Sequence, residues 1–343
     1  GCINLNSITI PENVTSIGYD AFKDCNGLKT ANFESLASLC RISFNNPYSN
    51  PLYLTHNLYI DNELITDLII PGNVGGIGDY VFLDCTSLTS VTIPGNVANI
   101  GNHAFQYCSK IKALTLSEGI GKIGNSAFRG CSGIKTLTIP NSVISIGADA
   151  FSGCSGMTVF DLQNGIESIG LYAFSCCSGL DSIYIPNSVK EIGVNAFEDC
   201  TKLKTVTITN SGTIIYSSVF GGCKNISKVY CTMETPCYLH PNAFDSTVYE
   251  KAQLFIPINT ADSYKSSEWN LFGIMEEMEY LAAANREYTS IDSNHQTESI
   301  DVFNTKGLRI RHINPRESFN LDELPTGIYI IKTESKTYKI INR

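Results

Sequence analysis

Hydrophobic residues return at a fixed spacing along most of this chain. One period of 23 residues follows the pattern C-x-x-L-x-x-I-x-I-P-x-x-V-x-x-I-G-x-x-A-F-x-x, and residues 131–153 show it in full. Phenylalanines follow the same spacing and are listed here: Phe22, Phe82, Phe105, Phe128, Phe151, Phe174, Phe197 and Phe220, with Phe244 after a step of 24. A period of this length with regular apolar positions is typical of a solenoid, in which each turn packs against the next.

The pattern inside one period predicts a short strand and a return path. Thr136–Ile139 alternates polar and apolar residues, which indicates a strand, and Pro140 ends it because proline cannot donate to a strand ladder. Gly147 supplies a turn, and the segment up to Cys154 has room for one helical turn only. We therefore expect a repeat solenoid of short parallel strands with loops and single helical turns.

Nine of the thirteen cysteines occupy one position of this period. They are Cys2, Cys25, Cys85, Cys108, Cys131, Cys154, Cys177, Cys200 and Cys223. Equivalent side chains on parallel turns point the same way, which does not suit disulfide geometry. Metal sites usually use C-x₂-C pairs, which the chain lacks. We interpret these cysteines as a buried structural spine.

The remaining cysteines leave two alternatives open. Cys231 and Cys237 lie off the spacing and are the best candidates for a disulfide. Cys2 follows the first residue, so the chain begins inside a repeat, as if earlier turns had been cut away; a lipoprotein-type cysteine is the alternative interpretation.

Two phrases of the repeat carry a family resemblance. The sequences IPNSVISIGADAFSGC (139–154) and IPNSVKEIGVNAFEDC (185–200) resemble the BspA-like leucine-rich repeats of bacterial surface proteins, and the resemblance covers residues 1–247. It implies a curved right-handed leucine-rich-repeat solenoid and a role in adhesion or in binding host proteins.

The regular spacing is interrupted once within this part of the chain and stops at residue 248. A step of 60 residues separates Cys25 from Cys85, which indicates an enlarged turn at about 41–66. Tyr59-Ile60 and Leu64-Ile65 flank Asp61-Asn62-Glu63 and predict a small hairpin. Such an insertion is often part of a binding face, although it can also simply cover the sheet. Residues 248–280 are predicted to form a capping turn.

The capping turn has to seal the open end of the core. Trp269, the only tryptophan of the chain, is suited to this role together with Phe272 and Ile274.

The end of the chain differs from the repeats in charge and pattern. We expect a linker at 281–287 and a small, all-β, sandwich-like domain at 288–343. Residues 299–343 carry a net charge of +3 against −12 on residues 1–298. DVFNTKG (301–307), LPTGIYIIK (324–332) and KIIN (339–342) resemble the C-terminal sorting domain of the type IX secretion system. This resemblance implies an extracellular or outer-surface location in a Gram-negative bacterium.

Composition and motifs argue against several functions. A net charge of −9 disfavours nucleic acids, which need a basic face, and no apolar run is long enough for a membrane helix. Residues 119–124 fit G-x-G-x-x-G but are ordinary repeat sequence instead of a strand-to-helix turn. The five histidines show no metal spacing, and we expect no catalysis, metal or cofactor. Thiol- or metal-dependent activity is the weakest of the functional alternatives.

The outward positions of the strands are the candidate binding face. They are Thr92, Thr115, Thr138, Asp161, Tyr184, Thr207 and Tyr230, with Lys112, Lys135 and Lys204 at the strand entries. Threonine also forms strands well on any solvated sheet. Because protein interfaces favour tyrosine anchors, we expect a monomer that binds an extracellular-matrix or cell-surface protein, and a glycan is the alternative ligand.

Overall fold

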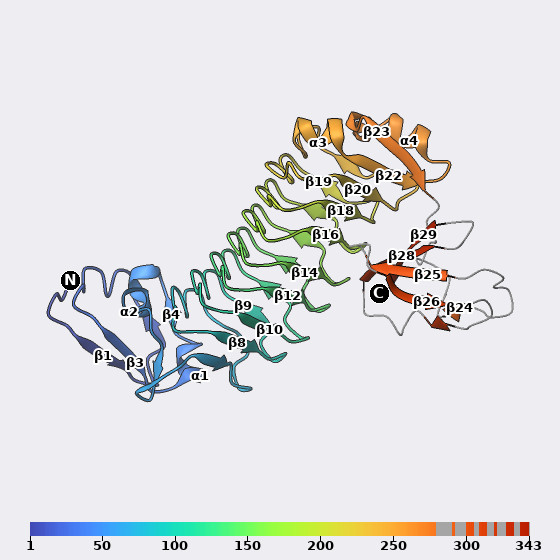
Figure 1. Ribbon diagram of the computed structural model, residues 1–343. Coiled ribbons are helices and arrows are strands. Elements are labelled where there is room, and N and C mark those ends of the chain that lie inside the picture. Colours follow the sequence, from blue (N-terminus) through green and yellow to red (C-terminus); the bar gives the residue numbers. More distant parts are fainter. Residues whose placement is uncertain are drawn as a thin grey trace. The chain divides into compact units, whose positions relative to one another are not determined.

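The computed structural model describes residues 1–278 and the backbone of six further strands between 290 and 342. Two compact units make up the chain: residues 1–254 with 263–275, and residues 255–262 with 276–343. The first unit is a solenoid whose turns follow one another along the chain (Figure 1). The parallel-strand repeat fold predicted from the sequence is therefore confirmed.

Each regular turn begins with a front strand. The front strands are β1 (Ser7–Ile10), β3 (Thr30–Phe33), β5 (Tyr59–Ile60), β7 (Asp67–Ile69), β8 (Ser90–Ile93), β10 (Ala113–Leu116), β12 (Thr136–Ile139), β14 (Val159–Leu162), β16 (Ser182–Ile185), β18 (Thr205–Ile208) and β20 (Lys228–Cys231). The strand predicted at Thr136–Ile139 has these bounds in the structure.

The front strands pair in parallel with a register of one period. Leu137 is opposite Phe160, and Val206 is opposite Val229. Within a strand, exposed and buried residues alternate, as in β12, because successive side chains point to opposite faces. The apolar half of the sequence pattern thus faces the core, and the polar half faces outward.

A second row of parallel strands lies on the return path of each turn. These back strands have two residues each: β2 (Ser16–Ile17), β4 (Ser43–Phe44), β9 (Asn99–Ile100), β11 (Lys122–Ile123), β13 (Ser145–Ile146), β15 (Ser168–Ile169), β17 (Glu191–Ile192), β19 (Ile214–Ile215) and β21 (Tyr238–Leu239). The sequence predicted only a path toward a turn here. Seven of these strands, from β9 to β21, form one continuous sheet.

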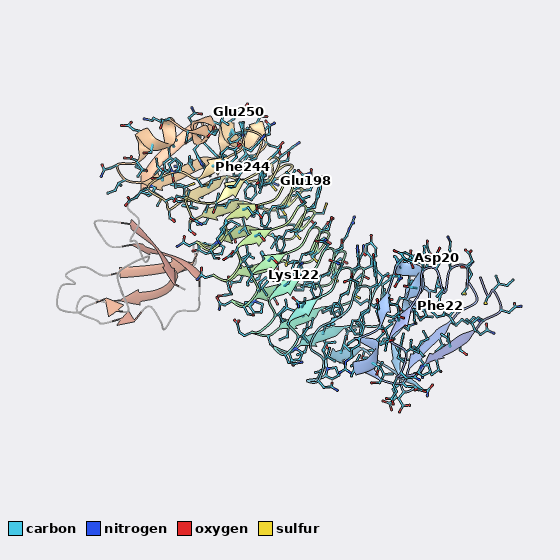
Figure 2. All side chains as sticks on the ribbon, turned by 180° about the vertical axis from the view of Figure 1, so that it is seen from behind. Asp20, Phe22, Lys122, Glu198, Phe244 and Glu250 are labelled. Carbon is cyan, nitrogen blue, oxygen red and sulfur yellow. The ribbon has the colours of Figure 1, made fainter. Side chains whose placement is uncertain are left out.

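Phenylalanine rings fill the space between the two rows of strands. Eight rings from Phe82 to Phe244 stack in sequence, with centroid separations of 4.7 to 5.6 Å. Figure 2 marks Phe22 and Phe244, the first and last phenylalanines of the repeat spacing. Each ring from Phe82 onward is buried, so the stack is the core of the solenoid.

The enlarged turn contains three short helices and a hairpin. They are α1 (Leu36–Leu39), η1 (Pro47–Ser49), α2 (Leu52–Thr55) and the hairpin of β5 with β6 (Glu63–Leu64). The predicted hairpin is present, but its second strand starts one residue earlier than expected. Asp61 and Asn62 both have a left-handed backbone (φ 48° and 66°), which a two-residue hairpin loop requires.

The end of the solenoid is covered by α3 (Ser246–Lys251), α4 (Ala261–Lys265) and η2 (Glu268–Leu271). Trp269 is fully buried, and its indole N–H donates to the Cys237 carbonyl at 2.9 Å. Its ring stacks on Phe272 at 5.9 Å. Ile274, expected to join them, is 46% exposed because it starts a strand after this cluster.

The second unit is built of β-strands. β22 (Gln253–Pro257) and β23 (Ile274–Met278) are neighbours at the boundary of the units. The later strands are β24 (Ser290–Ile291), β25 (Ile300–Asn304), β26 (Arg309–Ile313), β27 (Phe319–Asn320), β28 (Gly327–Lys332) and β29 (Thr337–Asn342). Four of them form an antiparallel sheet in the order β26-β25-β28-β29, and β24 pairs with β27. The linker predicted at 281–287 lies outside the described residues.

Candidate functional site: the front face of the solenoid

The outward side of the front strands presents a row of short polar residues. Thr115 and Thr138 are exposed, whereas Thr92 and Asp161 are half-buried. The register sets Thr92 beside Thr115 and Thr138 beside Asp161. Within each of these two pairs of strands the backbone pairing fixes the spacing of the side chains, and we call the whole row the front face.

Three lysines border the front face where the strands begin. Lys112, Lys135 and Lys204 are all exposed. Within residues 1–278, none of them forms an ion pair. Their backbones are hydrogen-bonded to neighbouring turns. The Lys112 amide donates to the Thr89 carbonyl, and the Lys204 amide donates to the Asp181 backbone carbonyl. The backbone positions of these lysines are therefore fixed, and their ammonium groups are available to a ligand.

Asp161 is the acidic member of the front face. Partial burial raises the pKa of its carboxyl, and a hydrogen bond donated by Gln163 at 2.6 Å opposes that rise. Withdrawal from water makes an unpaired carboxylate less stable, so a cationic group brought by a ligand would stabilise it. Asp161 can thus discriminate between partners by charge.

The part of the face around β18 differs from the expectation. Thr207, predicted to be available to a partner, is fully buried. Its register neighbours are Tyr184 on one side and Tyr230 on the other, whose longer side chains project from the same side of the sheet. Both tyrosines are half-buried. The accessible polar positions are therefore those between β8 and β14.

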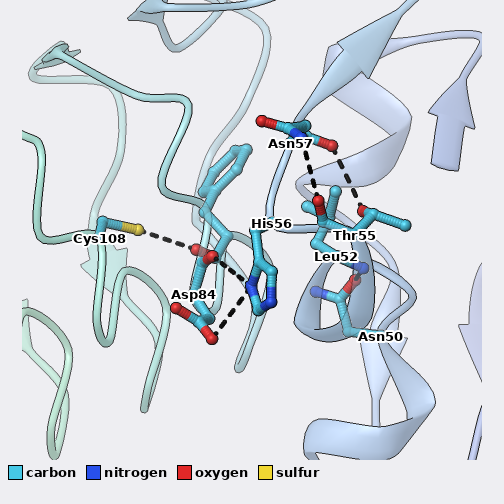
Figure 3. A network of polar contacts seen from close by, with 8 residues as sticks. Asn50, Leu52, Thr55, His56, Asn57, Asp84 and Cys108 are labelled. Atoms are coloured by element: carbon cyan, nitrogen blue, oxygen red, sulfur yellow. Dashed lines mark hydrogen bonds and ion pairs between the residues drawn. The ribbon is translucent and has the colours of Figure 1, made fainter. Parts of the chain in front are cut away.

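The cysteine spine is buried along its regular part. Each thiol from Cys108 to Cys223 donates to the phenylalanine carbonyl of the preceding turn, at 3.0 to 3.3 Å (Cys108 in Figure 3). Burial raises the pKa of Cys85 to about 11 and that of Cys154 to about 12. Since the thiolate is the reactive form, these groups are protected from chemistry at neutral pH.

Three cysteines depart from this description. Cys2 is exposed, and Cys176 is exposed beside the buried Cys177. Cys237 carries a reduced thiol, so the candidate disulfide with Cys231 is absent from this structure. No cluster of His, Cys, Asp or Glu suited to a metal ion occurs among the residues that the structure describes.

A group of aromatic residues was not recognised as a site from the sequence. Tyr19, Tyr48 and Tyr107 are exposed on the turns that precede the spine cysteines. His103 stacks on Tyr80 with ring centroids 4.7 Å apart. These tyrosines fall at variable positions of the repeat, so the only signal in the sequence was their number.

Comparison with protein families identifies both parts of the chain. Residues 1–62, 54–155 and 122–251 match the BspA type leucine-rich repeat region, in six copies. Residues 285–343 match a secretion system C-terminal sorting domain. The comparison with curated proteins gave no match.

Solved structures of bacterial leucine-rich-repeat proteins are similar to the solenoid. A leucine-rich repeat protein from Bacteroides ovatus is 22% identical, with a TM-score of 0.51, over 74% of this chain and 70% of that one. A leucine-rich repeat protein from T. pallidum is 26% identical, with a TM-score of 0.36, over 52% of this chain and 78% of that one. The first of these likenesses supports the fold and nothing beyond it.

The sorting domain and the repeats together establish the location of the protein. A chain with this C-terminal domain is exported, and the protein is extracellular or on the outer cell surface of a Gram-negative bacterium. Over the described residues, no helix has the length and apolar character needed to span a bilayer.

Proposed function

The chain belongs to the BspA-type leucine-rich repeat family, and we propose that it is a non-enzymatic binding protein that uses its front face to engage a protein of a host or of a neighbouring cell. The observation that carries this proposal is the row of exposed threonines at β10 and β12 with Lys112 and Lys135 beside it. The protein acts as a monomer in this proposal, through rigid display of side chains on stacked turns.

Preorganisation supports such a role. Each front strand is paired with at least one neighbouring strand, and the phenylalanine stack fixes the distance between turns. A surface that is already ordered loses little conformational entropy on binding, so modest contacts suffice for useful affinity. The hairpin of the enlarged turn, with Leu64 exposed, adds a second contact region at the edge of the sheet β1-β3-β5-β6.

The charge arrangement suggests the chemistry of the partner. Lys112 and Lys135 can pair with carboxylates of a partner, and Asp161 favours a cation one or two turns away. Complementary charges of both signs fix the orientation of a protein and raise its association rate. A protein surface offers both signs at this spacing.

The proposal is tested with the full chain against a panel of purified extracellular-matrix proteins. We expect at least one partner, and we expect Lys112→Glu/Lys135→Glu to weaken its binding roughly tenfold. Lys122→Glu is the matched control, because Lys122 is an exposed lysine on the back strand β11. Equal losses for the double variant and the control would contradict a role for the front face.

The tyrosine half of the face is tested separately. Tyr184→Ala/Tyr230→Ala removes the two aromatic side chains that flank Thr207. Loss of protein binding in this variant would extend the contact area to β20. A glycan array run in parallel detects the alternative ligand: binding of sugars alone, lost in either front-face variant, would replace a protein partner by a glycan.

A further inference from the structure

Aromatic rings gather on one edge of the solenoid, where the enlarged turn meets the first regular repeats. The six residues concerned, which we call the tyrosine edge, are Tyr19, Tyr48, Tyr53, Tyr80, His103 and Tyr107. Three of them are exposed, to 72% for Tyr19, 39% for Tyr48 and 45% for Tyr107, and the other three are half-buried. None of them belongs to the front face.

The six rings fall into two groups of three, Tyr48 with Tyr53 and Tyr107, and Tyr80 with His103 and Tyr19. Tyr48 and Tyr53 meet edge to face at 5.4 Å, and Tyr80 and His103 stack at 4.7 Å with planes 4° apart. Burial raises the pKa of Tyr53, and Tyr107 is near enough to raise it further. Burial likewise raises the pKa of Tyr80, with a contribution from Tyr19. The rings therefore follow the solenoid axis over consecutive turns.

The backbone fixes the rings in place. Tyr80, His103 and Tyr107 adopt a left-handed backbone, with φ of 63°, 57° and 63°. Each of their amides donates to a carbonyl of the following turn, at 2.7 to 2.9 Å. The Tyr107 ring lies across Gly130, where an added Cβ would be 2.5 Å from its Cδ1 atom. The edge is thus ordered before any ligand arrives, which limits the entropic cost of binding.

Planar polar side chains stand beside the rings and are held by hydrogen bonds. His103 Nδ1 lies 2.7 Å from the Gln106 amide oxygen. His56 Nδ1 lies 3.2 Å from an Asp84 carboxylate oxygen (Figure 3). An amide or a carboxylate held in this way keeps lone pairs or N–H groups for further partners. Ordered rings and ordered planar polar groups therefore occur on the same edge.

We propose that the tyrosine edge is a second binding site, which takes a neutral oligosaccharide. The positively polarised C–H groups of a pyranose face are attracted to the electron-rich face of an aromatic ring. The neighbouring amide and carboxylate groups, such as Gln106 and Asp84, accept hydrogen bonds from sugar hydroxyls. Since rings recur from turn to turn over about 15 Å, the edge suits a short linear chain of sugars better than a single one.

The charges of the edge disfavour anionic glycans, and its residue types favour a sugar over a protein. Asp20 neutralises Lys23 at 3.2 Å, and Asp84 adds a carboxylate, so sulfated or uronic acid chains would be repelled. Protein interfaces are enriched in arginine and methionine as well as tyrosine, and the edge offers only the last of these. Arg129 in the next turn is directed to Asp149 at 3.8 Å, and none of the six residues is an arginine or a methionine.

The experiment compares a variant of the tyrosine edge with a control variant at an equivalent repeat position elsewhere in the full chain. Tyr80→Asn/Tyr107→Gly removes two rings, and the repeat itself shows that both changes fit: Asn195 has φ 59° at the position of Tyr80, and Gly130 has φ 74° at the position of Tyr107. Tyr172→Asn is the control, because Tyr172 is exposed at the same repeat position, four turns further on. Thermal unfolding followed by circular dichroism checks that all the proteins fold.

Binding is measured by titration calorimetry with cellohexaose, chitohexaose and mannohexaose, and on an array that holds both host-type and microbial glycans. We expect the wild type and Tyr172→Asn to bind at least one neutral oligosaccharide, and the double variant to bind it roughly tenfold more weakly. Lys112→Glu/Lys135→Glu should keep the sugar affinity, which separates this site from the front face. The class of glycan bound on the array identifies its source.

Several results would overturn the proposal. These are no binding of any neutral oligosaccharide, an affinity that the double variant leaves unchanged, and binding of heparin alone. A matrix protein whose binding is lost in the double variant, together with a blank glycan array, would reassign the edge to a protein partner.

Discussion

The spine cysteine shows how a single residue type serves two needs of a repeat. Its side chain is small and apolar enough to stand beside the phenylalanine stack, and its S–H group donates to the phenylalanine carbonyl of the preceding turn. Alanine offers no donor at this position, and valine adds bulk to a packed core. The thiol therefore gives this carbonyl a second hydrogen bond, besides the one from the amide of its own turn, while it fills a small space.

Adjacent cysteines allow a direct test of this role. Cys177→Ala removes the bond to Phe151, which measures 3.3 Å, and leaves a small cavity, so we expect a loss of about 1–2 kcal/mol in the free energy of unfolding. Cys176→Ser changes the exposed neighbour and should stay within about 0.5 kcal/mol. Urea unfolding of both variants measures the difference. Equal effects would mean that the buried thiol contributes no more than a surface one.

Glu118 joins its own turn to the next through its carboxylate. The amides of Asn141 and Ser142 both donate to it at 3.0 Å. The Asn141 amide is the main reason that the pKa of Glu118 lies below its usual value, against a smaller opposing effect of burial. A lowered pKa in the folded state adds stability above the pKa of the unfolded chain, and this is lost as the pH falls through the folded value.

The resulting prediction concerns acid stability. Because Glu118 is exposed, Glu118→Gln should lower the stability at pH 7 by only about 0.5 kcal/mol. The difference from the wild type should shrink as the pH falls below 4. Unfolding curves between pH 3 and 7 measure this, with Glu191→Gln on the outward side of β17 as the control. A difference that grows toward low pH would contradict the assignment.

At the scale of elements, the irregular backbone of the enlarged turn has to pack against the regular turn that follows it. In regular turns, a phenylalanine amide donates to the carbonyl of the following turn, as Phe105 does to Ala127. For Val81, the equivalent carbonyl accepts instead from the side-chain amide of Asn50 at 3.0 Å. The Asn50 side-chain amide also donates to the Tyr80 carbonyl, and the Asn50 side-chain oxygen accepts from the Leu52 backbone amide. A buried side chain thus replaces a missing backbone neighbour.

Removal of this side chain should be costly. Asn50→Ala leaves the buried Val81 carbonyl and the Leu52 amide without these hydrogen bonds, and removes one of the two that the Tyr80 carbonyl accepts, so we expect a loss of about 2–3 kcal/mol in the free energy of unfolding. Asn57→Ala, in the same turn, removes one bond to Thr55 from a half-buried side chain and should cost less than about 1 kcal/mol. Chemical unfolding compares them. If both variants lost the same small amount, Asn50 would not be the joint between the turns.

At the scale of the whole molecule, stacking turns protects almost every thiol. Each turn covers its neighbour, so the spine cysteines from Cys25 to Cys223 are buried, and Cys40, Cys231 and Cys237 are buried as well. Only Cys2 and Cys176 are exposed. This distribution also bears on the alternative of thiol chemistry, since a reactive cysteine must be reached by its substrate.

The count of reactive thiols is therefore predicted. Two of the thirteen should react rapidly with a thiol reagent in the native protein, and the remaining eleven only after unfolding in denaturant. Mass spectrometry after pulse labelling identifies the modified residues. Rapid labelling of a spine cysteine such as Cys131 would show that the core opens, and would bring thiol-dependent activity back into consideration.

The sequence by itself determined the period, the strands and the inward residues of the solenoid. These follow from local alternation and from repetition: Thr136–Ile139 carries its strand pattern in four residues, and identical spacing forces Phe128 and Phe151 into equivalent places. The stretch Asp61-Asn62-Glu63 likewise predicts a hairpin, because aspartate and asparagine tolerate a left-handed backbone. The resemblance of residues 301–342 to a sorting domain needed only local motifs as well.

Tertiary structure alone decided which side chains of different turns meet. The burial of Thr207 depends on its surroundings in the folded protein, where Tyr184 and Tyr230 are its register neighbours. The tyrosine edge depends on how the enlarged turn brings Tyr48 and Tyr53 to the repeats that carry Tyr80 and Tyr107. Neither follows from a repeat pattern, because an irregular insertion has no period from which the positions of its residues can be inferred. The proposed tyrosine edge therefore arises where the regularity of the solenoid ends.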